Sequence, residues 1–152
     1  MIKYTRANLS DITEMMKLVE PEIEKGIILH RSSDEIANTI RSYILAKDED
    51  KIIGFCALYI YSQDLAEVRS LIVSSQYHRR GIGKGLIEAI LEEGKALGVK
   101  EILSLTYQVE FFKKMGFDVI EKALIPNQKI WTDCIKCKRF PICDEIALLK
   151  KL

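Results

Sequence analysis

The stretch of sequence that decides the fold is Gln76-Tyr77-His78-Arg79-Arg80-Gly81-Ile82-Gly83-Lys84-Gly85. The apolar run at 68–73 before it predicts a buried strand. From Ile82 onward apolar residues recur at helical spacing, and Gly98 is suited to end that helix. A strand that turns through basic residues and glycines into a helix N-terminus forms an anion site, because free N–H groups and the helix dipole face the ligand. The stretch therefore predicts a bound phosphate or pyrophosphate.

Three kinds of phosphate-binding loop compete for this pattern. A dinucleotide fingerprint needs G-x-G-x-x-G directly after the first strand, whereas the glycines here are spaced G-x-G-x-G in mid-chain, after an apparent antiparallel meander. A Walker loop needs G-x-x-x-x-G-K-[ST], which is absent. The remaining interpretation is an acyl-coenzyme A loop, R/Q-x-x-G-x-G/A, entered from the fourth strand of a mixed sheet. The alternative without a ligand is a glycine-rich turn with a solvated basic flank.

Length and composition predict an ordinary globular enzyme or binding domain. The chain has 152 residues, of which 48% are hydrophobic and 30% charged, so we expect one domain over residues 1–152. A net charge of +1 gives no support for nucleic-acid binding. The apolar runs are too short to span a membrane and the charged start is not a signal peptide, so we expect a cytoplasmic protein without a membrane partner.

Alternating helical and strand patterns run along the chain. We expect strands at about 2–5, 43–46, 51–61, 65–74 and 100–106, and one more after Gly116. One helix is expected at about 11–20, with Ser10 as its cap and Pro21 disturbing its end. A second helix is expected to start at Ser32, which has capping-box spacing to Glu35, and a third is expected at 109–115. The tail from Ala123 onward is less regular.

The cysteines are not spaced like a secreted disulfide scaffold. Cys56 lies alone in an apolar strand pattern, where a buried hydrophobic role is expected. A C-terminal segment at about 123–145 carries the other three as C-x2-C-x5-C, namely Cys134, Cys137 and Cys143. A closed zinc site needs four ligands, and Asp133, Asp144, His78 or Cys56 would have to supply the fourth. We therefore expect no metal. The three cysteines are then reduced thiols packed in a loop or form a disulfide during handling, and a metal site is the alternative.

Two stretches of the sequence resemble the core motifs of the GNAT superfamily of N-acyltransferases. They are residues 68–87 and Phe111-Phe112-Lys113-Lys114-Met115-Gly116-Phe117. The resemblance implies an α+β fold of three α/β/α layers around a mixed, mostly antiparallel sheet. It also implies acetyl-CoA as co-substrate, with the pyrophosphate on the loop and the pantetheine arm along the strand before it. His78 stands where Gln or Arg is usual, and Arg79 where Gly is common, but a cradle built from backbone groups should tolerate both. The implied cofactor residues are Leu71, Ile72, Val73, His78, Arg79, Arg80, Gly81, Ile82, Gly83, Lys84 and Gly85.

Segments 26–32, 64–71, 105–112 and 129–134 are more closely similar to the short bacterial N-acetylglutamate synthases. That resemblance implies transfer of the acetyl group to the α-amino group of L-glutamate, the first step of arginine biosynthesis. It implies a small-molecule amino-acid partner, and it leaves the oligomeric state open, a homodimer included. A GNAT enzyme for another amine and a non-catalytic acyl-CoA sensor remain the alternatives.

Acetyl transfer to an amine needs a base for the amine proton and an exit for the thiolate. Glu67, on the strand that leads to the pantetheine segment, matches the superfamily's general-base position. The alternative is an edge-strand carboxylate in solvent or paired with Arg69. The superfamily's usual tyrosine acid is replaced by Phe112, so Tyr107 is the candidate acid, with a packing role as the alternative.

A dicarboxylic acceptor needs cations, and arginine binds carboxylates in a bidentate manner. Strand alternation predicts that Glu67 and Arg69 point to the same face, which suits an acceptor whose amine and carboxylate lie side by side. The candidate acceptor residues are Arg31, Arg69, Ser70, Gln108 and Lys129.

Overall fold

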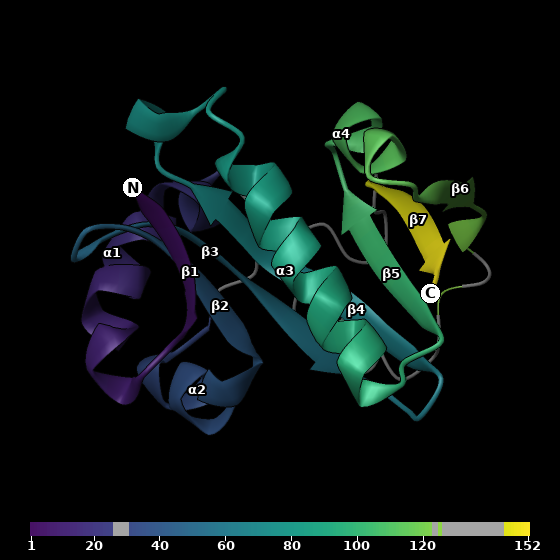
Figure 1. The fold of residues 1–152 in the computed structure, drawn as a ribbon, viewed down its shortest axis with the longest axis horizontal. Coiled ribbons are helices and arrows are strands. Elements are labelled where there is room, and N and C mark those ends of the chain that lie inside the picture. Colours follow the sequence, from purple (N-terminus) through teal and green to yellow (C-terminus); the bar gives the residue numbers. More distant parts are fainter. Residues whose placement is uncertain (26–30, 123–124, 126–144) are drawn as a thin grey trace.

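The computed structural model describes residues 1–25, 31–122, 125 and 145–152. Within these residues seven strands form one sheet in the order β1-β2-β3-β4-β5-β7-β6 (Figure 1). The neighbouring strands pair antiparallel except β4 with β5, so the expected mixed, mostly antiparallel sheet is confirmed. The strand bounds are β1 Ile2–Arg6, β2 Tyr43–Asp48, β3 Lys51–Ile60, β4 Leu65–Val73, β5 Glu101–Thr106, β6 Asp118–Ile120 and β7 Ile146–Lys151.

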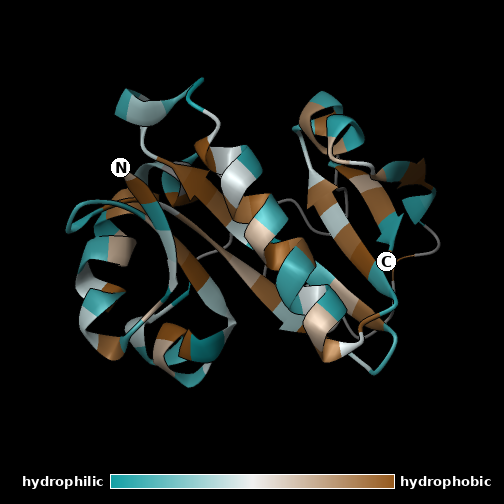
Figure 2. Ribbon diagram, in the orientation of Figure 1, coloured by the Kyte–Doolittle hydropathy of each residue, from teal (hydrophilic) through white to brown (hydrophobic). Residues whose placement is uncertain are grey.

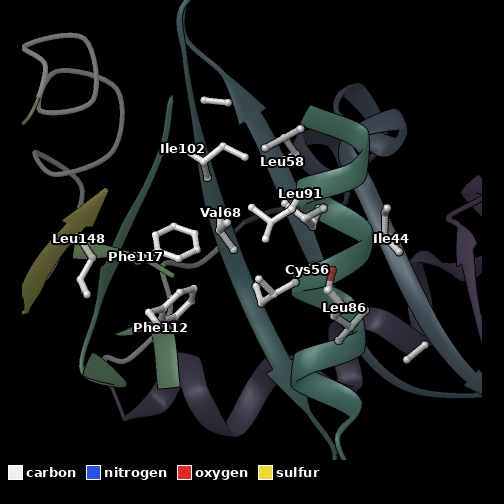
Figure 3. Close-up of a cluster of buried hydrophobic side chains, with 14 of the residues drawn as sticks. Ile44, Cys56, Leu58, Val68, Leu86, Leu91, Ile102, Phe112, Phe117 and Leu148 are labelled. Carbon is white, nitrogen blue, oxygen red and sulfur yellow. Dashed lines mark hydrogen bonds between the residues drawn. The ribbon is translucent and has the colours of Figure 1, made fainter. Parts of the chain in front are cut away.

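Helices cover both faces of the sheet, because the central strands are apolar on both sides. On β2, Tyr43 and Leu45 belong to the cluster beneath α1 (Ile12–Glu24) and α2 (Ser33–Asn38). The alternate residues Ile44 and Ala46 belong to the cluster beneath α3 (Ile82–Leu97) and α4 (Val109–Lys114). Figure 3 shows this second cluster between α3 and the sheet, and in Figure 2 hydrophobic and hydrophilic residues alternate along α3. The three-layer prediction is therefore confirmed.

The short N-terminal elements differ in detail from the prediction. Ser10 does not cap a helix; it lies inside a 3-10 turn, Leu9–Asp11, and the Asn8 N–H donates to the Asp11 carboxylate at 2.8 Å. Helix α1 continues through Pro21 to Glu24, because a proline near the last turn removes only one helical hydrogen bond.

Two further expectations concern the ends of elements. The predicted capping box of α2 is confirmed: Glu35 N–H donates to the Ser32 hydroxyl at 3.1 Å, and Ser32 N–H donates to the Glu35 carboxylate at 3.3 Å. Gly98 ends α3 with φ 88°, as predicted. Strand β7 was not predicted, because six residues in an irregular tail lack turn signals of their own.

The feature of the fold that positions a site is the divergence of β4 from β5. These parallel strands pair from Leu65 to Glu67 on β4 and from Glu101 to Leu103 on β5. Beyond that point β4 continues along β3 to Val73, while β5 continues along β7 to Thr106. The β3–β4 register also shifts between Phe55 and Ala57. The sheet therefore opens between β4 and β5 in its middle.

No helix in the described part of the chain is long and apolar enough to cross a membrane.

Candidate active site

The glycine loop forms the N-terminus of α3, as predicted. Gly81 caps the helix with φ 78°, and Gly85 N–H makes the first helical hydrogen bond, to the Gly81 carbonyl at 3.0 Å. The N–H groups of residues 82–84 precede that bond, so helix geometry points them out of the helix. A Cβ on Gly83 would lie 3.5 Å from the Phe111 ring and 3.9 Å from Val73. The helix therefore begins between the end of β4 and α4, beside the opening of the sheet.

The other residues assigned to acetyl-CoA fall into two groups. Leu71, Ile72 and Val73 are half-buried, with side chains packed on the two cores, so their backbone is what faces the opening between β4 and β5. Arg79, Arg80 and Lys84 are exposed around the start of α3. This arrangement fits a linear arm on the strand backbone and an anion at the helix.

Three loop residues have structural contacts of their own. The His78 ring lies 3.0 Å from the Val73 carbonyl, which ties the loop to the end of β4. Ile82 is buried in the α3 core. A Cβ on Gly85 would meet the Tyr4 hydroxyl, so this glycine allows β1 to pack closely against α3.

On the opposite face of β4, two charged side chains are buried at the point where β4 leaves β5. Glu67 is 2% exposed and Arg69 is 5% exposed. Their neighbours Ala66 and Val68 belong to the α3-side core, so strand alternation turns Glu67 and Arg69 toward α1 and α2. Burying charge is costly unless it is compensated, so a carboxylate and a guanidinium buried at this position mark a candidate site.

A second arginine reaches the same place. The Arg69 guanidinium carbon lies 3.3 Å from the centre of the Tyr59 ring, and that of Arg31 lies 5.9 Å from it. Arg31 is 9% exposed, so it is a buried residue and not a surface charge. Two buried guanidinium groups therefore lie near one ring, and guanidinium groups can bind carboxylates in a bidentate manner.

Ser70 and Tyr43 belong to the same group of side chains. Burial raises the pKa of Tyr43, while Arg31 and hydrogen bonds with Thr39 and Ser70 act in the opposite direction. Ser70 has φ 58°, an uncommon left-handed conformation inside a strand, and it lies at the register shift where β4 diverges. Arg31, Glu67, Arg69 and Ser70 are thus gathered on one face of the sheet.

The Glu67 carboxylate has a close neighbour from the end of β3. The Tyr61 hydroxyl donates a hydrogen bond to Glu67 Oε1 at 2.6 Å. Tyr59 is the register partner of Glu67 across the β3–β4 pair. Two tyrosines of β3 and its following turn therefore surround the acid.

The remaining predicted residues lie elsewhere or outside the described residues. Tyr107 follows β5 and is 37% exposed, and Gln108 is exposed at the start of α4 with its N–H on the Thr106 hydroxyl. Phe112 is buried edge-to-face against Phe111 and Phe117, so its ring packs the core and carries no proton. Lys129, Cys134, Cys137 and Cys143, with Asp133 and Asp144, lie outside the described residues.

The metal hypothesis has no support within residues 1–25, 31–122 and 145–152, which contain no cluster of three or more metal-ligating side chains. Cys56 is buried in the α3-side core, where loss of solvent raises the pKa of its thiol. That is the hydrophobic role expected for it.

Three tyrosines near Glu67, Arg69 and Arg31 were not predicted from the sequence, namely Tyr43, Tyr59 and Tyr61. A signal was present for two of them: Tyr59 and Tyr61 recur at the strand spacing of two, just before the turn that leads to Glu67. Tyr43 carried no such signal, because its place beside Arg31 depends on how β2 meets the segment before α2.

Sequence and structure comparisons show which known proteins this chain is similar to. The chain matches the sequence model of the Acetyltransferase (GNAT) family over residues 10–117. It is 41% identical to an uncharacterized N-acetyltransferase of Chlorobaculum tepidum over 149 residues, which cover 96% of this chain and 94% of that protein. It is 30% identical to an amino-acid acetyltransferase of Photorhabdus laumondii over 126 residues, or 82% of this chain. The aligned region is 28% of that longer relative.

Among solved structures, the fold is similar to that of N-acetylglutamate synthase from Neisseria gonorrhoeae in complex with coenzyme A and N-acetyl-glutamate. The TM-score is 0.88 at 24% sequence identity, and the match covers 100% of this chain and 35% of the other. At that identity the similarity supports a common fold.

Proposed function

The chain belongs to the Acetyltransferase (GNAT) family of acetyl-CoA-dependent N-acetyltransferases, and from this premise we propose that its acceptor is L-glutamate. The products are N-acetylglutamate and CoA, and the reaction is the first step of arginine biosynthesis. The observation that carries the proposal is the buried carboxylate of Glu67 beside two buried guanidinium groups, those of Arg69 and Arg31. Such a pocket suits an acceptor with one amine and more than one carboxylate.

The acceptor is held by the cationic side of the pocket. Arg69 and Arg31 bind the two carboxylates, with Ser70 as a neutral hydrogen-bond donor. Gln108, exposed at the start of α4, and Lys129, outside the described residues, stay acceptor candidates from the sequence alone. The acceptor nitrogen then faces Glu67. Since an ammonium cannot act as a nucleophile, Glu67 accepts the amine proton, directly or through water.

Acetyl-CoA supplies the thioester. Backbone N–H groups at the start of α3, with Arg79, Arg80 and Lys84 around them, bind its pyrophosphate, and the backbone of residues 71–73 binds the pantetheine arm. The proton for the leaving sulfur comes from Tyr107 or from water, because Phe112 has none to give. We propose that residues 1–152 act as one acetyltransferase unit in the cytoplasm, without a metal.

Similarity to named amino-acid acetyltransferases over 82% of this chain supports an amino acid as acceptor. The test is thiol release from acetyl-CoA by the purified full chain, with product mass by mass spectrometry, offered L-glutamate, L-glutamine, L-aspartate, a peptide and a polyamine in parallel. We expect turnover to be fastest with glutamate. Turnover with peptides or polyamines, but none with glutamate and glutamine, would reject the proposal.

A further inference from the structure

The structure places a tyrosine on the carboxylate that we propose as the base. Tyr61 follows β3, and its hydroxyl donates to Glu67 Oε1 at 2.6 Å, within the short range typical of a phenol bound to a carboxylate. We infer that Tyr61 is a positioning residue for the general base: it orients the Glu67 carboxylate and stabilises its ionised form. The inference rests on the proposed function, in which Glu67 takes the amine proton.

The backbone of Tyr61 is held by the turn between β3 and β4. Tyr61 N–H donates to the Leu65 carbonyl at 2.9 Å, and the Ser62 hydroxyl accepts from Asp64 N–H and Leu65 N–H at 3.2 and 3.1 Å. The Asp64 carbonyl in turn accepts from Glu101 N–H, the first of β5, at 2.9 Å, and from Lys100 N–H just before it, at 3.1 Å. The turn is therefore tied to both strands that diverge at Glu67, which gives the phenol a defined position.

The charged and titratable groups around Glu67 come from β4, from β3 and the turn after it, and from the segment before α2. On β4 itself Arg69 shares its face, on β3 Tyr59 is its register partner, and Tyr61 binds its Oε1. From the segment before α2, Arg31 reaches the same ring as Arg69. On β5 its partner is Leu103, which does not titrate. Tyr59 thus contacts the arginines and Tyr61 the acid, so neighbouring tyrosines orient the two halves of the pocket.

A hydrogen bond to a carboxylate favours its ionised form and lowers its pKa. Removal of the phenol hydrogen therefore raises the pKa of Glu67 and leaves less of the base ionised on the acid side. One hydrogen bond to a charged group corresponds to about one pH unit. In the pH profile of kcat/KM for the acceptor, the acidic limb should move to a higher pH by about one unit. At pH values below the limb, kcat/KM should fall by about tenfold.

The experiment compares the wild type with Tyr61→Phe, which keeps the ring and removes only the hydroxyl. We expect the acidic limb of the Tyr61→Phe profile to lie about one pH unit higher than that of the wild type, with an unchanged KM for acetyl-CoA. Urea unfolding shows that the variant is folded.

A second measurement needs no acceptor. Carboxyl 13C NMR of protein labelled at glutamate follows the titration of Glu67, whose resonance is the one missing in Glu67→Gln. A higher pKa in Tyr61→Phe supports the inference, and an unchanged pKa with an unchanged acidic limb overturns it. If the wild type does not acetylate glutamate, the proposed acceptor fails, while the NMR titration still decides the role of Tyr61.

Discussion

Two neighbouring side chains of β4 have opposite charge and separate tasks in the proposed reaction. Glu67 and Arg69 are both buried, and the strand spacing of two puts them on the same face. Each has its own tyrosine partner, Tyr61 for the acid and Tyr59 for the guanidinium. Substitutions at the two positions should therefore affect different kinetic constants.

Replacement of the acid tests proton transfer. In Glu67→Gln the side chain keeps its size and can still accept a hydrogen bond from Tyr61, but it cannot take the amine proton. We expect kcat to fall by about 10²–10⁴-fold, the usual contribution of a general base, with little change in the KM for acetyl-CoA. Steady-state kinetics measure both constants.

Glu93→Gln is the control for this substitution, because Glu93 pairs with Arg6 at the protein surface, at 2.6 Å. It should keep wild-type kinetics and change stability by less than about 1 kcal/mol. Full activity of Glu67→Gln would exclude Glu67 as the base.

Replacement of the arginine tests acceptor binding. Arg69→Ala removes one charged, bidentate partner of a carboxylate, so the KM for glutamate should rise by about 10–100-fold while the KM for acetyl-CoA stays near the wild-type value. Arg69→Lys should restore only part of the affinity, since a lysine offers one point charge and stacks poorly on Tyr59. Arg41→Ala, at an exposed position, is the control. A rise confined to the KM for acetyl-CoA would remove Arg69 from the acceptor pocket.

At the scale of the element, helix α3 has a left-handed glycine at each end, and the two have different neighbours in the proposed complex. Gly81 caps its N-terminus with φ 78° and Gly98 its C-terminus with φ 88°. A Cβ at either position would meet no atom within 4 Å. The space beside Gly81 is where the pyrophosphate of acetyl-CoA is proposed to bind, whereas Gly98 is at the far end of the helix.

Gly81→Ala and Gly98→Ala therefore make a matched pair. Each forces an L-residue into a left-handed conformation, so each should lower the free energy of unfolding by about 1–2 kcal/mol. Gly81→Ala should also weaken acetyl-CoA binding, and Gly98→Ala should not. Urea unfolding and calorimetric titration with acetyl-CoA measure the two effects. Equal acetyl-CoA affinity in both variants would place the pyrophosphate elsewhere.

At the scale of the whole molecule, the most C-terminal strand of the described residues lies inside the sheet and not at its edge. Strand β7 lies between β5 and β6, and Leu148 on it pairs with Ser104 and Val119. The Leu148 side chain is fully buried in the α3-side core (Figure 3). Ile146, at the start of the strand, is 37% exposed. The α3-side core is therefore completed only by the end of the chain.

This position of β7 makes a stability prediction. Leu148→Ala should lower the free energy of unfolding by about 2–5 kcal/mol, as large-to-small changes in a core do, because the cavity is closed in by strands on both sides. Ile146→Ala should cost much less, since its side chain is already partly in water. Urea denaturation of both variants checks the difference, and equal effects would mean that β7 contributes little to the core.

Much of the fold could be predicted from the chain because the signals are local. Apolar runs and helical spacing located β1 to β5, α3 and α4, and the glycines marked both ends of α3. The predictions based on Ser10 and Pro21 were wrong. Ser10 lies inside a 3-10 turn and does not cap a helix, and α1 continues through Pro21 near its end. Strand β7 was missed because a short apolar run becomes a strand only when two edges are available to pair with it.

The site divides in the same way. The amino-acid sequence by itself determined the glycine loop at the start of α3 and the shared face of Glu67 and Arg69, because a helix N-terminus and a strand spacing of two are local geometry. Only the tertiary structure decided that Arg31 reaches the Tyr59 ring, that Tyr61 binds Glu67, and that β4 parts from β5 beside them. These contacts join segments far apart in the chain or depend on the exact strand register, and packing rather than local conformation sets both.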